Sequence, residues 1–513
     1  MITKIYSAAL LGVESAEVEV EVSSRDSEKM GTIIVGLPDA AVRESAQRVT
    51  TALTASALPF GYGINTVNLA PADLKKEGPS FDLPIALAMT ACAQDEDLSK
   101  LTDDLLVVGE LALDGALRPV KGALSIALGA KKSGRRRVIV PAANASEAAM
   151  VSGIEVYGIS NLHEAWKFIS GEKVLAPEPK PALKARSESH SLVDLDEVKG
   201  QHQVKRALEI TAAGGHNLLM VGPPGTGKSM LAKRMATIMP DLSEDEAIET
   251  TRIHSVAGLL HAREGLVQSR PFRAPHHTIS DAGLLGGGTN PGPGEISLAH
   301  NGVLFLDELP EFRRSTLEVM RQPLEDGTVT ISRAAGTYDF PADVLLVVAL
   351  NPCPCGFHGD SKRECRCSPR QVEQYRQKIS GPLLDRIDLH IEVPLIDFKQ
   401  LSSHEESESS ETVRSRVMNC RATQQDRFSA QLQTRTNSDM GPKLMREHCR
   451  IDSSASQLLE QAMEQLNFSA RAHDRILKVA RTIADLATCE SITTDHLLEA
   501  IQYRSLDRKL SFS

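Results

Sequence analysis

The sequence predicts a multidomain α/β protein, in which a parallel-sheet core lies between an N-terminal mixed α/β domain and a C-terminal helical domain. A short apolar run, a glycine-rich loop and a helix follow one another around residues 217–236. A stretch rich in proline, lysine, glutamate and serine at 173–192 indicates a stiff, solvated linker in front of this core. Helical spacing of apolar residues returns from 452 to 505.

The composition is that of an ordinary globular protein. The 513 residues suffice for roughly two to four domains. A net charge of −10 argues weakly against nucleic-acid binding. A protein with this net charge can still have a local basic face that binds nucleic acid. The sequence has neither a long apolar run nor a signal-peptide core, so we expect a cytoplasmic protein that does not bind membranes. Four of its 8 cysteines crowd into a short segment, which favours a reducing compartment and one metal site.

Residues 1–172 are expected to form the first domain. Helical spacing predicts helices at 40–57 and 123–132, and a turn at 75–84 opens a third helix of small residues that runs through Ala93. Apolar runs predict strands at Val18–Val22, Ile33–Val35, Ile64–Leu69, Leu105–Leu111 and Val138–Val140.

Four segments of this domain carry a resemblance: Gly78–Ser80, Gly109–Gly115, Pro119–Val120 and Val138–Pro141. In order and spacing they resemble the Lon-type protease domain, an α/β fold of the ribosomal S5 domain 2 type. The resemblance places Ser80 on the nucleophile, but Leu124 where the activating lysine belongs, and leucine cannot accept a proton. Lys121 lies earlier and should face elsewhere on the helix. We therefore expect an inactive protease-like domain, with Ser80 as a helix N-cap and Asp82 in the first turn.

The core, residues 193–395, contains a motif that fits the phosphate-loop pattern G-x-x-x-x-G-K-[ST] at every fixed position. A buried strand, Asn217–Val221, precedes the motif and a helix follows it, so backbone N–H groups and a helix N-terminus converge on phosphate oxygens. This context disfavours the alternative of a glycine-rich turn without a ligand. We expect Lys228 to reach the β- and γ-phosphates of ATP and Ser229 to ligate Mg²⁺. The expected nucleotide-binding residues are Gly222, Pro223, Pro224, Gly225, Thr226, Gly227, Lys228 and Ser229.

A second buried strand, Gly302–Leu306, ends in two carboxylates. Hydrolysis of Mg²⁺–ATP needs such a pair at the carboxyl end of a strand. Asp307 is expected to hold the Mg²⁺ shell and Glu308 to polarise the attacking water. An ordinary strand end is the alternative, and the phosphate loop upstream argues against it.

Two further segments resemble parts of AAA+ ATPases. Val344–Asn351 is a third buried strand, and Asn351 looks like the sensor 1 residue, which contacts the γ-phosphate or the water. Gly381–Asp388 resembles the arginine-finger segment of magnesium chelatases and minichromosome-maintenance helicases, with Arg386 as the finger. Such a finger enters the neighbouring subunit's site, which implies a ring, by resemblance a hexamer. The alternative is a surface arginine that pairs with a neighbouring aspartate.

Two insertions match the helix 2 insert and the presensor 1 hairpin of those families, which face the ring pore. The first is an exposed glycine- and proline-rich loop between 255 and 295, and the second is a β-hairpin at 328–340. Basic side chains on both are expected to meet DNA phosphates, although each alone also fits a structural or solvated role. These residues are Arg270, Arg273, His276, His277 and Arg333.

Cys353, Cys355, Cys365 and Cys367 bracket a short polar loop and fit a closed tetrahedral Zn²⁺ site. The C-x-C spacing departs from the commoner C-x-x-C, and His358 could replace one sulfur. Disulfides and unrelated reduced thiols are the alternatives.

Residues 396–513 are expected to form a connecting segment and a helical lid. The stretch from 400 to about 440 is polar and irregular, which indicates a solvated start to a connecting helix. Ser469 is the expected N-cap of a lid helix, and Arg471 matches the sensor 2 arginine of chelatase-type ATPases, with a structural arginine as the alternative.

Taken over essentially the whole chain, the sequence resembles the ComM/YifB family of bacterial magnesium-chelatase-like ATPases. The family implies a cytoplasmic hexameric DNA motor that uses ATP and Mg²⁺ and aids branch migration of incoming single strands. The alternatives are a protein remodeller or a metal-insertion chaperone like the magnesium chelatase I subunit. A working protease is disfavoured by Leu124.

Overall fold

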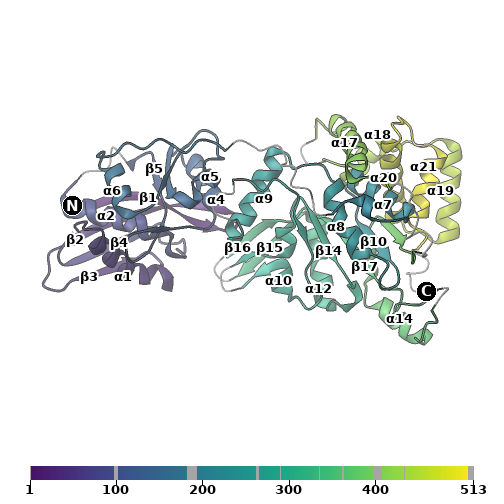
Figure 1. Cartoon of the computed structure of the whole chain (residues 1–513), viewed down its shortest axis with the longest axis horizontal. Coiled ribbons are helices and arrows are strands. Elements are labelled where there is room, and N and C mark those ends of the chain that lie inside the picture. Colours follow the sequence, from purple (N-terminus) through teal and green to yellow (C-terminus); the bar gives the residue numbers. More distant parts are fainter. Residues whose placement is uncertain are drawn as a thin grey trace.

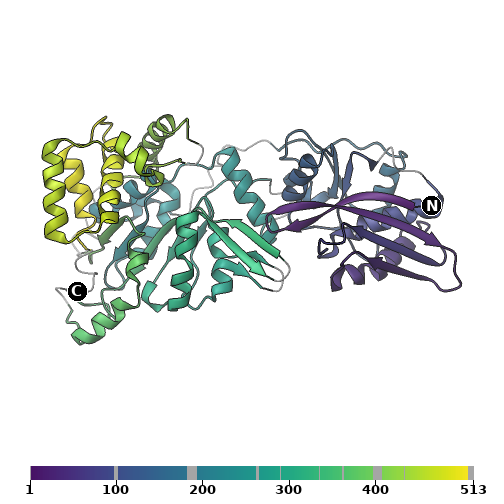
Figure 2. The ribbon, with the colours of Figure 1, turned by 180° about the vertical axis from the view of Figure 1, so that it is seen from behind.

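The structure, a computed structural model, shows three bodies in a row. The N-terminal domain lies at one end, the parallel-sheet core in the middle and a helical domain at the other end (Figures 1 and 2). The fold class predicted from the sequence is confirmed. In the part of the chain that is described, no helix is both long and apolar enough to cross a membrane. The described residues are 2–96, 102–181, 193–260, 265–288, 291–333, 336–360, 363–396, 407–431 and 434–506.

The N-terminal domain is built on a seven-stranded mixed sheet. Its strands are β1 (Ile2–Leu11), β2 (Glu14–Arg25), β3 (Gly31–Val35), β4 (Ile64–Ala70), β5 (Leu105–Val107), β8 (Arg137–Pro141) and β9 (Glu155–Ile159). They are ordered β3-β4-β2-β1-β5-β8-β9, around the long antiparallel hairpin of β1 and β2. Two short strands, β6 (Glu110–Leu111) and β7 (Leu117–Arg118), pair outside this sheet. The strands expected for this domain are present, and β1 was not predicted.

The helices of this domain are α1 (Ala40–Ala55), α2 (Asp82–Gln94), α4 (Ala123–Lys132), α5 (Ala145–Ala148) and α6 (Leu162–Ile169). Helix α2 is buried on nearly all sides because its small apolar residues contact both the sheet and α1. Asp82 lies in its first turn, fully buried, and its carboxylate accepts hydrogen bonds from the Arg48 guanidinium at 2.9 and 3.1 Å.

The expected capping role of Ser80 is wrong. Ser80 lies in a 3₁₀ turn, Pro79–Phe81, and α2 begins after it with Phe81 at the N-cap and no side-chain capping bond. The turn displaces the N-cap by one residue, from Ser80 to Phe81, and the Ser80 carbonyl instead accepts the Gly109 N–H at 2.9 Å.

The core sheet has five parallel strands, in the order β11-β14-β17-β10-β18. They are β11 (Phe272–Arg273), β14 (Val303–Leu306), β17 (Leu345–Leu350), β10 (Leu218–Val221) and β18 (Leu389–Glu392). Along β10, Leu218 and Met220 join one hydrophobic cluster, whereas Leu219 and Val221 join another on the opposite face. Both faces are therefore buried, which explains why these strands are continuous apolar runs rather than alternating ones.

The helices of the core are α7 (His202–Gly214), α8 (Lys228–Ile238), α9 (Glu244–Ala257), α10 (Asp281–Leu285), α11 (Glu295–Leu298), α12 (Arg314–Val319), α13 (Arg321–Asp326), α14 (Pro369–Gln377) and α15 (Gly381–Leu384). The two insertions form hairpins, β12 (Gly286–Gly287) with β13 (Gly292–Pro293) and β15 (Thr328–Arg333) with β16 (Gly336–Pro341). The hairpins are neighbours: a Cβ added to Gly286 would lie 3.0 Å from Ile331, and one added to Gly287 would lie 3.2 Å from Arg333.

The helical domain consists of α17 (Ser410–Arg427), α18 (Pro442–His448), α19 (Ser453–Leu466), α20 (Ala470–Leu486) and α21 (Thr494–Gln502). Ser469 caps α20, as predicted, by accepting the Ala472 N–H at 3.2 Å. The connecting helix expected after the polar start at 400 corresponds to α17, an eighteen-residue helix that covers more of the polar segment than the sequence indicated. Its buried face holds Gln424, whose side-chain amide donates to the Ala213 carbonyl at 2.9 Å. Residues 397–406 and 432–433 of that prediction lie outside the described residues.

The N-terminal domain packs on the core through α4 and α9. The Ser255 hydroxyl of α9 hydrogen-bonds to the buried carboxylate of Glu147, and the Leu124 N–H donates to the same carboxylate at 2.9 Å. Arg252 of α9 pairs with Glu14 at 2.6 Å. A buried carboxylate thus joins the two domains. Of the predicted linker, residues 182–192 lie outside the described part.

Candidate ATP site and its surroundings

The phosphate loop connects the end of β10 to the start of α8, as predicted. Gly225 and Gly227 have φ angles of +80° and +86°, which side chains rarely adopt, so these positions favour glycine. A Cβ added to Gly222 would lie 2.4 Å from the Val393 carbonyl, so this position is also restricted to glycine. Lys228 Nζ donates to the carbonyls of Gly222 at 2.6 Å and Pro223 at 2.8 Å.

Three neighbouring strand ends bring the predicted site residues together. The Ser229 hydroxyl of α8 lies 2.5 Å from Asp307 Oδ2, directly after β14. Asn351, directly after β17, has its Oδ1 3.2 Å from Lys228 Nζ. Burial lowers the pKa of Lys228, and the charges of Asp307 and Glu308 oppose this effect. The residues expected to bind phosphate and Mg²⁺ therefore converge at the carboxyl edge of the sheet, the place where ligands bind in such folds.

Glu308 occupies an unusual backbone conformation. Its φ is +52°, in the left-handed region that non-glycine residues adopt rarely and at a cost. Its N–H donates to Asp307 Oδ1 at 2.9 Å. The His277 Nδ1 lies 3.6 Å from its carboxylate, and the ring of His277 contacts that of Phe312 edge-on. His277, which was predicted to meet DNA phosphates, lies beside the candidate base in the structure. No spacing in the sequence signals this neighbour.

Arg386 lies at the other edge of the sheet. Its carbonyl accepts a hydrogen bond at 3.0 Å from the side chain of Asn217, which immediately precedes β10. The four residues of β10 separate that edge from the phosphate loop by about 13 Å. Within its own chain Arg386 pairs with Glu325, rather than with the aspartates considered above. It therefore faces away from its own ATP site.

Arg471 lies on the same edge as Arg386. Its guanidinium is 4.0 Å from the carboxylate of Asp385, and its side chain is 64% exposed. The next arginine along α20, Arg475, pairs with the buried Asp388. Burial alone would raise the pKa of Asp388, but Arg475, His216 and the Asn217 N–H together hold it well below its usual range. The largely buried Arg386 and the exposed Arg471 thus lie near each other, beside the ion pair of Arg475 and Asp388.

The other predicted DNA contacts divide into paired and unpaired residues. Arg270 is mostly buried and pairs with Glu246 at 2.9 Å, and Arg273 holds both oxygens of Glu295 at 2.6 Å. These two arginines have the structural role that the sequence left open. His276 is exposed, and its ring stacks on that of His277 at 4.1 Å between centroids. Arg333 is exposed at the end of β15, and within the described residues no carboxylate pairs with it.

The four cysteines lie together next to the ATP site. Their sulfur atoms are all within 4.8 Å of one another, and they form a group that could hold a metal ion. None of the four cysteines is in a disulfide. The predicted cluster of thiols is therefore present, and Zn²⁺ as its ligand stays a prediction. His358, the proposed substitute ligand, is not a member of this group.

The N-terminal domain keeps the arrangement that made protease activity doubtful. Leu124, which the Lon-type resemblance places where the lysine belongs, is fully buried among apolar side chains. The Lys121 side chain lies against Gly258 of the core, 2.9 Å from where a Cβ of that residue would be. Both observations support an inactive domain.

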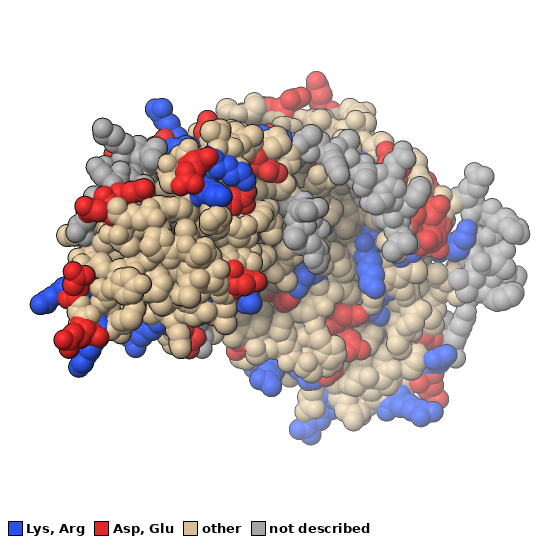
Figure 3. Space-filling model, turned by 60° about the vertical axis from the view of Figure 1, so that its left-hand side comes forward, with Lys and Arg blue, Asp and Glu red and all other residues tan. Residues whose placement is uncertain are grey.

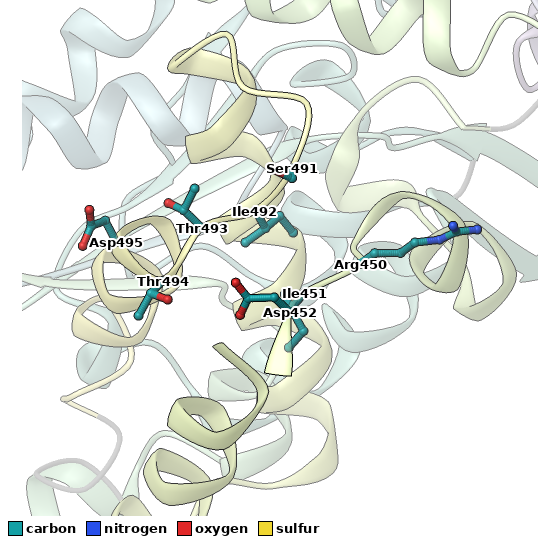
Figure 4. Close-up of a pocket in the computed structure, with 8 residues that line it drawn as sticks. All are labelled: Arg450, Ile451, Asp452, Ser491, Ile492, Thr493, Thr494 and Asp495. Atoms are coloured by element: carbon teal, nitrogen blue, oxygen red, sulfur yellow. The ribbon is translucent and has the colours of Figure 1, made fainter. Parts of the chain in front are cut away.

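Two other features of the described surface do not compete with the ATP site. The view of the N-terminal end in Figure 3 is mostly neutral, with acidic and basic residues interspersed and no continuous basic band. A pocket in the helical domain lies where α19 and α21 begin (Figure 4). Asp452 and Thr493 already cap those helices, and Arg450 extends away from the two acids, Asp452 and Asp495, that line the pocket.

Comparison with known proteins matches this architecture in three successive parts. Residues 18–144 match the family described as subunit ChlI of Mg-chelatase, 194–401 the family of magnesium chelatase, subunit ChlI, and 407–504 its C-terminal part. The strands and helices of the core and helical domain lie within these matches.

Similar proteins extend over nearly the full chain. The uncharacterized protein YifB of Escherichia coli is 44% identical over 99% of this chain and 97% of its own. The competence protein ComM of Haemophilus influenzae is 43% identical over 99% and 98%. A DNA replication licensing factor, mcm7 of Schizosaccharomyces pombe, is 26% identical over 38% of this chain and 23% of its own. The chain therefore belongs to the YifB/ComM family of magnesium-chelatase-like AAA+ proteins.

Proposed function

We propose that this chain is an ATP-hydrolysing motor that forms a ring, by family resemblance a hexamer, on single-stranded or branched DNA. Its role is branch migration and strand integration in the cytoplasm, when incoming DNA recombines with the chromosome during natural transformation. The name of the competence relative, which is 43% identical over nearly its whole length, supports this context.

The convergence of Lys228, Asp307, Glu308 and Asn351 is the observation that carries ATP hydrolysis. Lys228 exchanges its loop carbonyls for phosphate oxygens, and Ser229 and Asp307, already in contact, hold Mg²⁺. The ion neutralises charge on the β- and γ-oxygens. Glu308 orients the attacking water and accepts its proton, and Asn351 hydrogen-bonds near the γ-phosphate.

The position of Arg386 supports a ring. It lies across the sheet from its own phosphate loop, so it can complete only a neighbour's site, where a guanidinium stabilises the charge that develops on the phosphoryl group. Arg471, 4.0 Å from the adjacent Asp385, faces the same neighbour. We infer that two arginines from one subunit serve the ATP site of the next.

The paired hairpins support DNA as the polymer. Arg333 extends from β15 beside the glycines of β12, so the two insertions form one surface with an exposed cation. The hairpin β15–β16 leads directly into β17, which ends at Asn351. Changes at the nucleotide can thus reach Arg333 through a short rigid connection, and its contacts to phosphates are independent of base sequence.

The second candidate function is a protein remodeller or a metal-insertion chaperone of the magnesium chelatase type, which the matched family models favour. We rank it lower, because the sequence shows no resemblance to a porphyrin site.

The two candidates differ in what stimulates hydrolysis. ATP turnover of the full chain is measured alone, with single-stranded DNA, with a branched DNA junction and with a denatured protein, using Lys228→Ala as the blank. The motor predicts stimulation by DNA, strongest with the branched junction or single strands. Stimulation by denatured protein alone would reject the motor in favour of the remodeller.

A further inference from the structure

The segment 351–367 carries four sulfur atoms arranged around a common centre. The Cys353 sulfur lies 3.3 Å from that of Cys355 and 3.7 Å from that of Cys365, and Cys355 and Cys365 are 3.6 Å apart. When the Cys367 sulfur is included, the four sulfur atoms all lie within 4.8 Å of one another. Two Cys-x-Cys arms thus face each other across a short loop.

These separations match a tetrahedral thiolate site. Four sulfurs at about 2.3 Å from one Zn²⁺ lie about 3.8 Å from each other, close to the three separations between these sulfur atoms. A disulfide needs sulfurs at about 2.05 Å, and none of the three pairs approaches that value. Four thiolates select a soft or borderline ion such as zinc over Mg²⁺ or Ca²⁺, which prefer oxygen ligands.

The surroundings of the sulfurs also suit a bound cation with four thiolates. Backbone N–H groups of Phe357 and Arg366 donate to the Cys355 sulfur, as outer contacts do in thiolate sites. The Arg363 guanidinium lies over the Phe357 ring, 5.1 Å from its centroid. The loop sequence also contains Arg363 and Arg366, whose positive charge is opposite in sign to the net charge of four thiolates and one divalent ion.

The cysteine loop also contacts the ATP site. Cys353 is fully buried two residues after Asn351. Gly356 has a φ of +84°, and a Cβ added there would lie 2.5 Å from Pro224 Cδ, so the loop rests directly on the phosphate loop. On its other side, Arg376 of α14 donates to the Pro352 carbonyl at 3.4 Å.

We propose that Cys353, Cys355, Cys365 and Cys367 bind one structural Zn²⁺, and that this zinc loop holds Asn351 and the phosphate loop in their binding geometry. The ion closes all four coordination positions with sulfur, so it has no open position for chemistry. Its effect on the ATP site is mechanical. It holds the two Cys-x-Cys ends of a polar loop together, and the contact of Gly356 with Pro224 then limits the movement of the phosphate loop.

Metal content tests the first half of this proposal. Full-length protein purified under reducing conditions should carry one Zn²⁺ per chain by elemental analysis. A Cys365→Ser, Cys367→Ser double variant should carry none, whereas Cys489→Ser, a matched change in the helical domain, should keep it. If the double variant fails to fold, wild-type protein exchanged with Co²⁺ should show the absorption of tetrahedral cobalt thiolate. Absence of both metal and this spectrum overturns the site.

Nucleotide affinity tests the second half. A fluorescent ATP analogue should bind several-fold more weakly after zinc is removed with a chelator, and added Zn²⁺ should restore the affinity. The measurement reports binding rather than turnover, so it stays informative whether or not DNA is the substrate. Unchanged affinity in folded, zinc-free protein would contradict the link to the phosphate loop.

Discussion

The Lys228 side chain folds back onto the phosphate loop from which it extends and hydrogen-bonds to it. Its ammonium group is mostly buried and is bound to two loop carbonyls and to Asn351. Burial lowers the pKa of Lys228 because it removes water from the ammonium group. A desolvated ammonium gains more from phosphate oxygens than a hydrated one does, so the loop is prepared for an anionic ligand.

Removal of the candidate base should separate binding from hydrolysis. Glu308→Gln keeps the size of the side chain and loses the proton acceptor, so ATP should still bind while turnover falls by about 10²-fold or more. Assembled rings should accumulate in the ATP-bound state. The matched control is Glu311→Gln, on the same turn, which pairs with Lys378 and should hydrolyse ATP normally. Near-normal turnover of Glu308→Gln would remove Glu308 from the mechanism.

Ser80 and Asp82 should differ sharply in their effect on stability. Ser80 makes no capping bond, so Ser80→Ala should change the free energy of unfolding by less than about 0.5 kcal/mol. Asp82→Ala leaves the Arg48 charge without its buried partner and should cost about 3 kcal/mol or more. Chemical denaturation followed by fluorescence measures both. Equal losses would show that Ser80 stabilises the start of α2 as strongly as Asp82 does, and would contradict its lack of a capping role.

Among the residues, those in fixed-spacing motifs were predictable and those joined by packing were not. Lys228, Ser229, Asp307 and Asn351 follow three buried strands, and parallel strands end at one edge of a sheet. The pairing of Arg386 with Glu325 joins positions 61 residues apart. Such pairs depend on how helices and loops pack, which no local pattern encodes.

At the scale of elements, the contact between α4 and α9 contains a titratable group. Burial raises the pKa of Glu147, although the Ser255 hydroxyl, the Leu124 N–H and the Asn144 amide oppose this effect. The folded state therefore binds the proton more tightly than the unfolded state does. The corresponding stability is fully present below the ordinary value of 4.5 and is lost as the pH rises through the raised pKa.

Glu147→Gln should remove this pH dependence. The amide cannot ionise, so the variant should gain thermal stability relative to wild type as the pH rises above 4.5, and then stay level. Thermal melts at a series of pH values give the difference between the two proteins. Glu172→Gln, on an exposed turn, is the control and should follow wild type. A constant difference between Glu147→Gln and wild type would rule out titration of this group.

Elements with strong periodicity or turn chemistry were predictable, as the β15–β16 hairpin and the cap at Ser469 show. A connecting helix was expected here, but the bounds of α17 were not, because its buried positions include Cys420 and Gln424, which weaken its apolar stripe. Gln424 is tolerated there because its amide satisfies the Ala213 carbonyl. Tertiary contacts thus stabilise an element that composition describes as polar.

For the whole molecule, Arg333 should govern how DNA binding responds to salt. Arg333→Ala should weaken binding to all oligonucleotide sequences alike. It should also flatten the slope of log affinity against log salt by about 0.7 for each single-strand phosphate that the arginine no longer neutralises. Basal ATP turnover and ring assembly should be retained. Arg446→Ala, which removes an exposed arginine from α18, is the control for charge alone. Parallel salt titrations of Arg333→Ala and wild type would exclude the phosphate contact.

In Arg333→Ala, the rate of branch migration should fall by a larger factor than the DNA affinity. Translocation uses the arginine–phosphate contact anew at every step, whereas binding at equilibrium forms it once. The contrast between the two assays distinguishes a hairpin that drives DNA from one that only holds it.

In the proposed ring, Arg386 of one chain completes the ATP site of the next, so assembly would be a condition for hydrolysis rather than a consequence of it. Glu325 holds the arginine within the free chain, and a neighbouring nucleotide would compete for it. This exchange links subunit assembly to the base of the β15–β16 hairpin, since Glu325 lies in α13 directly before β15.

The most direct test is to mix two inactive variants. Arg386→Ala keeps the phosphate loop and lacks the finger, whereas Lys228→Ala lacks a working loop and keeps the finger. In mixed rings, some Arg386→Ala subunits receive the finger of a Lys228→Ala neighbour, so ATP turnover on branched DNA should rise well above the sum of the separate variants. Turnover equal to that sum, in rings shown to contain both variants, would contradict a site shared between subunits.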